Sequence, residues 1–213
     1  LAISTRVWYN EELKSSNFIV PGLCGILLMM LTTLLTAMAV TGEKERNTFE
    51  QLAASPIHPA ELIIGKILPY ALVSSLGVIL VVTLGRGIFG VPLRGSLVTL
   101  AVFSGLFLLT ALGLGLLIST AAKTQQAAMF LAMTLTILPT ILLSGFIFPI
   151  NNMPPVVRYI AYAVPARYFI VALRGIFLKG VGFGVLWPQA AALAAFAIVV
   201  IILAATRFRK RLE

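Results

Sequence analysis

Long uncharged runs alternate with short charged segments along this chain. Five windows contain no Asp, Glu, Lys, Arg or His: residues 18–41, 67–85, 95–122, 124–157 and 180–206. An α-helix needs about 20 residues to cross the hydrocarbon core of a bilayer. Each window therefore predicts one membrane span. We expect the five spans at about 18–41, 63–85, 96–119, 126–143 and 185–206.

The composition agrees with this interpretation. Of 213 residues, 60% are hydrophobic and only 11% are charged, whereas soluble domains average about 25% charged residues. A soluble domain of this size could not bury so much apolar surface. We therefore predict an all-α, polytopic membrane helical bundle whose transmembrane domain covers residues 18–213.

The fourth window is too long for one helix and too short for two. Pro139 divides it, and Pro149, Pro154 and Pro155 end it. We expect a kinked span to about residue 143, followed by re-entrant chain, which survives at membrane depth only where protein or water covers it. Pro154 and Pro155 should start a short helix whose apolar face lies on the spans.

Residues 158–179 are apolar but contain four cations: Arg158, Arg167, Arg174 and Lys179. Two short helices that lie in the interface, or dip into it and return, fit better than a sixth span. We therefore expect a re-entrant or interfacial two-helix element at about 144–179. Ser144, Gly145, Pro149 and Arg174 are its gate candidates. In the alternative interpretation, the arginines only anchor the element at the interface.

Small residues predict close packing at two places in the spans. Ala111 and Gly115 are four positions apart, and so are Ala191 and Ala195. Such pairs place small side chains on one helix face and let a second helix approach closely.

The charge balance is strongly basic. Sixteen Lys and Arg against seven acidic residues, all of them Glu, give a net charge of +9. In a membrane protein this balance suits anionic lipid headgroups better than nucleic acid. The cluster Arg207-Phe208-Arg209-Lys210-Arg211 predicts a cytoplasmic C-terminus under the positive-inside rule, so five spans place the N-terminus outside.

The rare residues exclude several kinds of site. The only His is His58 and the only Cys is Cys24, and the chain has no Asp. A Ser-His-Asp triad, a His/Cys metal cluster and an internal disulfide are all excluded. The sequence also lacks a P-loop for ATP. We expect neither a metal nor a cofactor bound by this chain, and no enzyme activity of its own.

The loop between the first two spans is the most informative one. Thr48 and Gln51 have the spacing of a capping box, so a helix should start near Phe49. Pro56 ends it, which gives a helix at about 48–55. Phe49 and Leu52 lie on one face. The segment is either a solvated loop helix or a docking helix for a soluble partner.

Two motif regions resemble one family. The first reads Glu43-x-Glu45-Arg46-x-Thr48-x-Glu50-x-Leu52-x-x-Ser55-Pro56, and the second runs from Leu143-Ser144-Gly145-Phe146-x-Phe148-Pro149 through Pro165-x-x-Tyr168 to Arg174. Together they resemble the type-2 ABC exporter permeases, in their bacterial multidrug-type branch. The resemblance implies that the loop carries a cytoplasmic coupling helix seated in a cleft of a separate ATPase subunit.

The resemblance also implies partners and a location. The contact with the ATPase subunit would involve eight residues: Glu43, Arg46, Thr48, Phe49, Glu50, Leu52, Ser55 and Pro56. ATP and Mg would be bound by that subunit, and a second permease subunit would complete a homo- or heterodimer in the bacterial inner membrane. Residues 1–17 look like the tail of an extracytoplasmic domain that follows a first span, so we expect the C-terminal membrane portion of a permease.

The energy source separates the classes of function. The five windows contain no ionisable residue through which a secondary transporter would couple. A transporter built this way needs an external motor, and the predicted function is an ATP-driven exporter of a hydrophobic or amphiphilic substrate. A passive channel or a membrane scaffold is the alternative. For a channel, Thr32, Thr33 and Thr36 form the best polar stripe.

Overall fold

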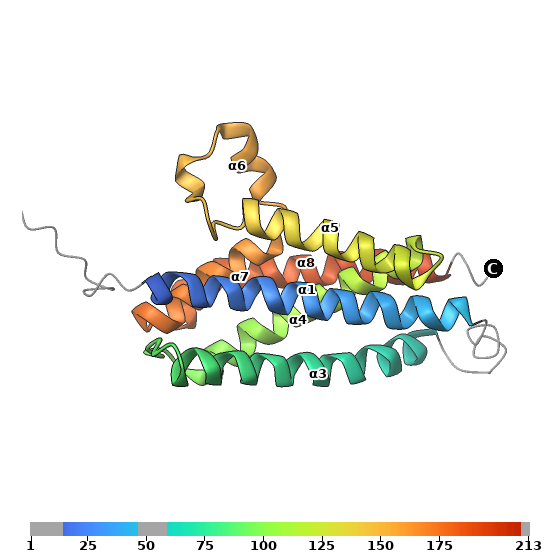
Figure 1. Ribbon diagram of the computed structural model, residues 1–213, viewed down its shortest axis with the longest axis horizontal. Coiled ribbons are helices and arrows are strands. Elements are labelled where there is room, and N and C mark those ends of the chain that lie inside the picture. The colour runs from blue at the N-terminus through green and yellow to red at the C-terminus, as the bar shows by residue number, and fades with distance from the viewer. Residues whose placement is uncertain (1–14, 47–58, 210–213) are drawn as a thin grey trace, which may run out of the picture.

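The computed structural model describes residues 15–46 and 59–209, and its long axis is set by five helices (Figure 1). They are α1 (Ser15–Glu45), α3 (Pro59–Gly87), α4 (Leu97–Ala121), α5 (Gln125–Leu143) and α8 (Phe183–Arg209). All five are long and apolar enough to cross a membrane. Successive helices run in opposite directions, and the predicted five-span, all-α bundle is confirmed.

Local sequence signals explain where several helices begin. The Ser96 side chain accepts a hydrogen bond from the backbone N of Val98 at 3.2 Å and caps α4. Thr124 caps α5 in the same way, with 3.2 Å to the backbone N of Ala127. These caps satisfy backbone donors that have no partner inside the helix. They also fix the short connection between α4 and α5 at residues 122–124, called the α4–α5 turn.

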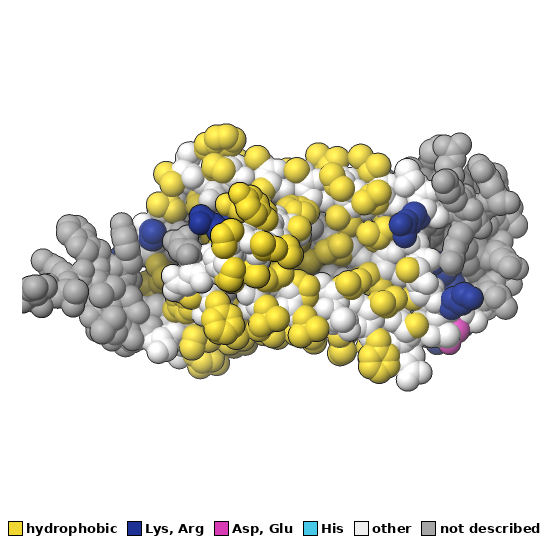
Figure 2. Space-filling view, turned by 90° about the horizontal axis from the view of Figure 1, so that it is seen from above, with side chains coloured by type: hydrophobic (Ala, Val, Ile, Leu, Met, Phe, Trp, Pro, Cys, Tyr) yellow, Lys and Arg dark blue, Asp and Glu magenta, His cyan; other side chains and the backbone are white. Residues whose placement is uncertain are grey.

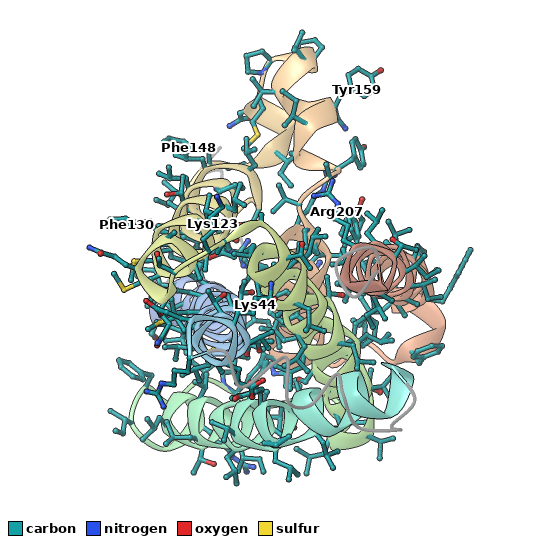
Figure 3. All side chains as sticks on the ribbon, turned by 90° about the vertical axis from the view of Figure 1, so that its right-hand side faces the viewer. Lys44, Lys123, Phe130, Phe148, Tyr159 and Arg207 are labelled. Atoms are coloured by element: carbon teal, nitrogen blue, oxygen red, sulfur yellow. The ribbon has the colours of Figure 1, made fainter. Side chains whose placement is uncertain are left out.

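The bundle has two distinct ends. Lys44, Lys123 and Arg207 lie at one of them, which faces the viewer in Figure 3 and is called the Lys44 end below. The opposite end holds the start of α1, the end of α5 and the start of α8, and is called the Arg174 end. Seen from above, hydrophobic side chains cover most of the length between them, and basic side chains appear only toward the ends (Figure 2). This distribution suits a bilayer-spanning molecule.

A chain of short helices lies at the Arg174 end. It consists of η1 (Ile150–Asn152), α6 (Pro155–Ala161), α7 (Pro165–Arg174) and the π-helical η2 (Gly175–Lys179). The axis bends by 84° between α6 and the segment Pro165–Lys179. This part of the chain therefore consists of short helices with a sharp bend between them and not of one continuous helix.

One expectation about this element is wrong. Helix α6 does begin at Pro155, but its apolar side chains do not lie on the spans. It projects sideways from the bundle next to the end of α5 (Figure 1). Val156 and Tyr159 are 71% and 76% exposed, and Ala161 is the one buried residue of α6. A helix of seven residues that projects from the bundle has few neighbours against which to bury its apolar side chains.

Helix α4 forms the centre of the bundle and packs against α1 on one side and α8 on the other. Helix α7 also belongs to the core, because Phe169 and Ile170 are fully buried. The rings of Phe107 and Phe169 stack with their centroids 4.0 Å apart. Helix α3 is peripheral and exposes Leu72, Leu76 and other large apolar side chains, as expected for a helix that contacts lipid.

Gly115 allows α1 and α4 to approach closely, as the spacing of Ala111 and Gly115 predicts. A methyl group at Gly115 would lie 2.6 Å from Cβ of Thr36 and 2.8 Å from the carbonyl oxygen of Thr33. The Thr33 hydroxyl donates a hydrogen bond to the carbonyl of Ala111 at 3.2 Å across the same contact. By contrast, Ala191 and Ala195 are exposed on α8, so the second small-residue pair makes no close helix contact among the described residues.

We expect Gly115→Ala to destabilise the protein by about 1–3 kcal/mol, the usual cost of overpacking a tight core. Gly105→Ala is the matched control, because Gly105 is also in α4 but has nothing within 4 Å of the added methyl group. Thermal unfolding of the purified full-length permease measures the difference. Equal melting temperatures for the two variants would contradict the close α1–α4 contact.

Candidate functional site at the two ends of the bundle

Only part of the predicted ATPase contact can be placed. Thr48, Phe49, Glu50, Leu52, Ser55 and Pro56 lie outside the described residues, and so does the predicted helix at 48–55. Glu43 is half-buried in the last turn of α1, and Arg46 is exposed in the turn that follows it. The backbone N of Arg46 donates to the carbonyl of Gly42 at 3.1 Å. The two described residues therefore lie at the Lys44 end, next to the loop that the motif occupies.

The end of α1 is fastened to the α4–α5 turn. The Lys44 ammonium donates a hydrogen bond to the carbonyl of Ser119 in the last turn of α4. One carboxylate oxygen of Glu45 accepts from both the backbone N and the side-chain amide of Gln125, each at 3.2 Å. Gly42 lies against Gln125, where an added methyl group would be 3.0 Å from its side-chain carbon. We call this set of contacts the Lys44–Glu45 latch.

The latch has a simple electrostatic basis. The carboxylate of Glu45 lies at the N-terminus of α5, where unpaired backbone N–H groups and the helix dipole favour negative charge. The Lys44 cation lies at the C-terminus of α4, where unpaired carbonyls favour positive charge. Sequence reasoning missed this contact. Glu45 belongs to the quoted motif, but Gln125 is 80 positions away and carries no signal of its own.

Arg174 is the central side chain at the opposite end. One guanidinium nitrogen donates to the carbonyl of Gly145 at 3.1 Å. The other lies 3.5 Å from each of the carbonyls of Phe146 and Phe18. The guanidinium carbon also lies 3.7 Å from the centre of the Phe18 ring. Arg174 therefore joins the start of α1 to the chain just after α5, and two of its three acceptors, the carbonyls of Gly145 and Phe146, lie outside any helix.

The other gate candidates surround the same turn. Ser144 is buried at the C-cap of α5, and Gly145 has a φ of +81°, which favours glycine. Pro149 immediately precedes η1. The Ser144 hydroxyl and the Nε of Arg174 are buried and have no hydrogen-bond partner within the described structure. Such groups are unusual in a protein interior.

Phe146 anchors this turn to α1. A methyl group at Gly22 would lie only 2.1 Å from a ring carbon of Phe146, so the ring occupies the space that glycine leaves. Sequence reasoning quoted Phe146 in the family motif but did not name it as a site residue. The Pro21-Gly22 pair in α1 was the signal that could have predicted a close contact there.

The other arginines of the element behave differently. The guanidinium of Arg167 lies 3.9 Å from the centre of the Tyr162 ring. A hydrogen bond with Arg167, and its charge, lower the pKa of the Tyr162 phenol below its ordinary value. Arg158 is exposed on α6. These two arginines fit the interfacial-anchor interpretation, whereas Arg174 makes specific contacts with the backbone.

The threonine stripe of α1 does not line a pore. Thr32, Thr33 and Thr36 are all buried. The Thr32 hydroxyl donates to the hydroxyl of Ser74 in α3 at 2.9 Å, and the Thr36 hydroxyl donates to the carbonyl of Thr32 at 2.8 Å. With Thr33 bonded to α4, the stripe holds α1 to its neighbours. Among the described residues, no group of three or more His, Cys, Asp or Glu could hold a metal ion.

Comparison with known families decides what these features belong to. A family model described as ABC-2 type transporter matches residues 1–178 of this chain. The chain belongs to the ABC-2 type transporter family. This confirms the family to which the two sequence motifs pointed.

Relatives of this ABC-2 chain include three proteins of Escherichia coli (strain K12). The chain is 43% identical over 178 residues to the probable multidrug ABC transporter permease YbhS, covering 84% of this chain and 47% of that protein. It is 32% identical over 182 residues to YbhR, of the same description, covering 85% and 49%. It is 32% identical over 216 residues to the inner membrane transport permease YhhJ, covering 99% and 56%. The chain thus spans about half the length of these relatives.

Proposed function

We propose that this ABC-2 chain is the membrane-spanning part of a permease subunit of an ATP-driven exporter. It moves a hydrophobic or amphiphilic substrate out of the cytoplasm or the inner leaflet, and a separate subunit hydrolyses ATP. The family match over residues 1–178 carries the proposal. The names of YbhS and YbhR, both probable multidrug ABC transporter permeases, support it.

The Lys44–Glu45 latch supports an external motor. The loop predicted to hold the coupling helix begins directly after Arg46, so its first fixed point is the latched end of α1. A force on the loop is passed through Glu45 to the N-terminus of α5, and through Lys44 to the C-terminus of α4. Three spans thus respond together to the ATPase subunit, since packed helices move as rigid elements.

The contacts of Arg174 support a gate at the other end of α5. The helix that the latch holds at its start is the one whose end, Ser144-Gly145, faces Arg174. A shift of α5 along its axis changes the distance from Arg174 to the carbonyls of Gly145 and Phe146. We assign the element at 144–179 to the release of substrate on the outer side, with Arg174 as its brace.

The proposal includes the assembly and its location. The partners are a cytoplasmic ABC ATPase subunit, which binds ATP and Mg, and a second permease subunit, identical or homologous. The complex lies in the bacterial inner membrane with the Lys44 end and the C-terminus in the cytoplasm. The passive channel is the weaker candidate, because the threonines that would line its pore are buried between helices.

The orientation is tested by cysteine labelling of the full-length permease in cells. Cys24 is buried and is first replaced by Ser. We expect Ser55→Cys to react with a membrane-impermeant maleimide only after the cells are permeabilised. Val156→Cys, on the exposed face of α6, should react in intact cells. Labelling of Ser55→Cys from outside would overturn the proposed topology.

The transport function is tested with the full-length permease and its ATPase in vesicles. We expect hydrophobic compounds from a panel to stimulate ATP hydrolysis, and the permease to be required for that stimulation. Two results together would favour a passive channel: flux of the same compounds without ATP, and a rate of ATP hydrolysis that does not depend on the permease.

A further inference from the structure

An apolar groove lies at the Lys44 end between α5 and α8, with α4 as its floor. It has a volume of about 240 Å³ and is lined by Leu114, Leu117, Ile118, Ala121, Leu131, Leu135, Thr136 and Arg207. A cavity of about 150 Å³ lined by apolar side chains is large enough to bind benzene. The groove therefore has room for a segment of an alkyl chain.

Arg207 is the single charged side chain that the described residues contribute to this lining. It is exposed and extends from the last turns of α8, and Figure 3 shows it between α5 and α8 when the bundle is viewed from the Lys44 end. In the sequence it is followed by Arg209, Lys210 and Arg211. An apolar groove with a guanidinium at its mouth complements an anionic headgroup joined to an acyl chain.

The short helices lie at the other end of the bundle from Arg207. Helix α6 projects next to the end of α5, at the Arg174 end and away from the C-terminus (Figure 1). Because Arg207 lies at the Lys44 end, an amphiphile whose headgroup binds it lies in the half of the bilayer next to Arg207. With the orientation proposed above, that half is the inner leaflet.

We infer that this groove binds an anionic phospholipid of the inner leaflet, with its phosphate at Arg207 and one acyl chain against Leu117 and Leu135. The inference rests on the proposed orientation for the choice of leaflet, but not for the contacts themselves. A bound lipid fills the space between α5 and α8 and supports the start of α5, which the latch holds on its other side.

A second apolar groove shows why charge decides the occupant. It lies between α1 and α3, has a volume of about 380 Å³, and is lined by Ser16, Cys24, Leu27, Leu84, Phe89 and further apolar residues. Within the parts of the chain that the structure describes, no charged side chain lines it. This groove has nothing that distinguishes an anionic lipid from a zwitterionic one, so it serves as an internal control.

The test uses the full-length permease with its ATPase, reconstituted with phosphatidylglycerol or phosphatidylcholine that carries a diazirine in one acyl chain. After irradiation, lipid-modified peptides are identified by mass spectrometry. We expect phosphatidylglycerol to label the peptides covering 114–121 and 131–136 about fivefold more strongly than phosphatidylcholine does. One cation near a membrane surface favours an anionic lipid by about this factor. Peptides that line the α1–α3 groove should show no preference.

Three variants make the result specific. Arg207→Gln should reduce labelling of the α4 and α5 peptides by phosphatidylglycerol to the phosphatidylcholine level. Lys123→Gln should not, because Lys123 is exposed on the α4–α5 turn and does not line the groove. Ala121→Trp should reduce labelling by both lipids, since the indole fills the groove.

Unchanged labelling in Arg207→Gln would overturn the inference. So would cross-links between two permease copies through the groove residues in place of lipid, which would make this face a subunit interface. Co-purification of the ATPase is measured in the same samples. Its absence in the wild type would overturn the proposed function while leaving the lipid result intact.

Discussion

Replacing Arg174 by Ala is expected to destabilise the permease by about 3 kcal/mol and to slow export at least tenfold. Hydrogen bonds from charged groups contribute about 1.5–3 kcal/mol, and a buried acceptor left without a donor adds its own desolvation cost. The Arg174 guanidinium donates to the carbonyls of Gly145, Phe146 and Phe18 at the same time. Its loss leaves non-helical backbone without donors at membrane depth, where such backbone is poorly tolerated.

Thermal unfolding of the solubilised complex and substrate-stimulated ATP hydrolysis measure the two effects. Arg174→Lys should recover part of the stability but less of the export, because a single ammonium cannot hold several carbonyls in a fixed plane. Arg158→Ala is the matched control: it removes an exposed arginine of the same element and should change neither property. If Arg174→Ala leaves both assembly and export intact, that arginine only anchors the interface.

Replacing Phe49 by Ala is expected to weaken the assembly of permease and ATPase about 30-fold. The residue is the only aromatic side chain in the predicted coupling helix at 48–55. Truncation of a central aromatic at an interface commonly costs about 2 kcal/mol or more, which corresponds to roughly that change in affinity. The apolar ring and Leu52 on the same helix face would fill a pocket of the ATPase subunit.

Co-purification with the ATPase and transport-linked ATP turnover measure this effect. Phe89→Ala is the matched control, because Phe89 is an exposed phenylalanine near the opposite end of the bundle. It should leave assembly unchanged. A Phe49→Ala permease that still retains its ATPase and its turnover would show that the assignment of the 48–55 segment is wrong.

The number and places of the membrane helices follow from the sequence alone. A charge in the bilayer core is costly, so the uncharged windows mark the spans without knowledge of any partner residue. Prolines act just as locally. Pro155 starts α6, as predicted, because a missing N–H is harmless at the first position of a helix. The family motifs could also be recognised in the sequence. They pointed to the ABC-2 family, which the comparison confirmed.

The sequence did not determine which face of each helix is buried. In a soluble helix polar residues mark the outer face, but lipid and protein interior are both apolar, so these spans lack that contrast. The two small-residue pairs illustrate this: Ala111 and Gly115 lie against α1, whereas Ala191 and Ala195 are exposed. Likewise, the threonines of α1 were the best pore-lining candidates in the sequence, but in the structure they form hydrogen bonds between helices.

The tertiary structure alone decided the contacts that carry the proposals. Arg174 meets Phe18 across 156 positions of the chain, and Glu45 meets Gln125 across 80. Nothing local marks such pairs, because each side chain has ordinary flanking residues and finds its partner only when the helices have packed. The groove beside Arg207 arises in the same way, from three helices whose spacing is set by the side chains between them. The sequence determined which segments lie in the membrane, since that depends on the free energy of transferring each segment by itself from water to lipid. The packed bundle determined which polar groups meet inside it, since that depends on the relative placement of all five spans.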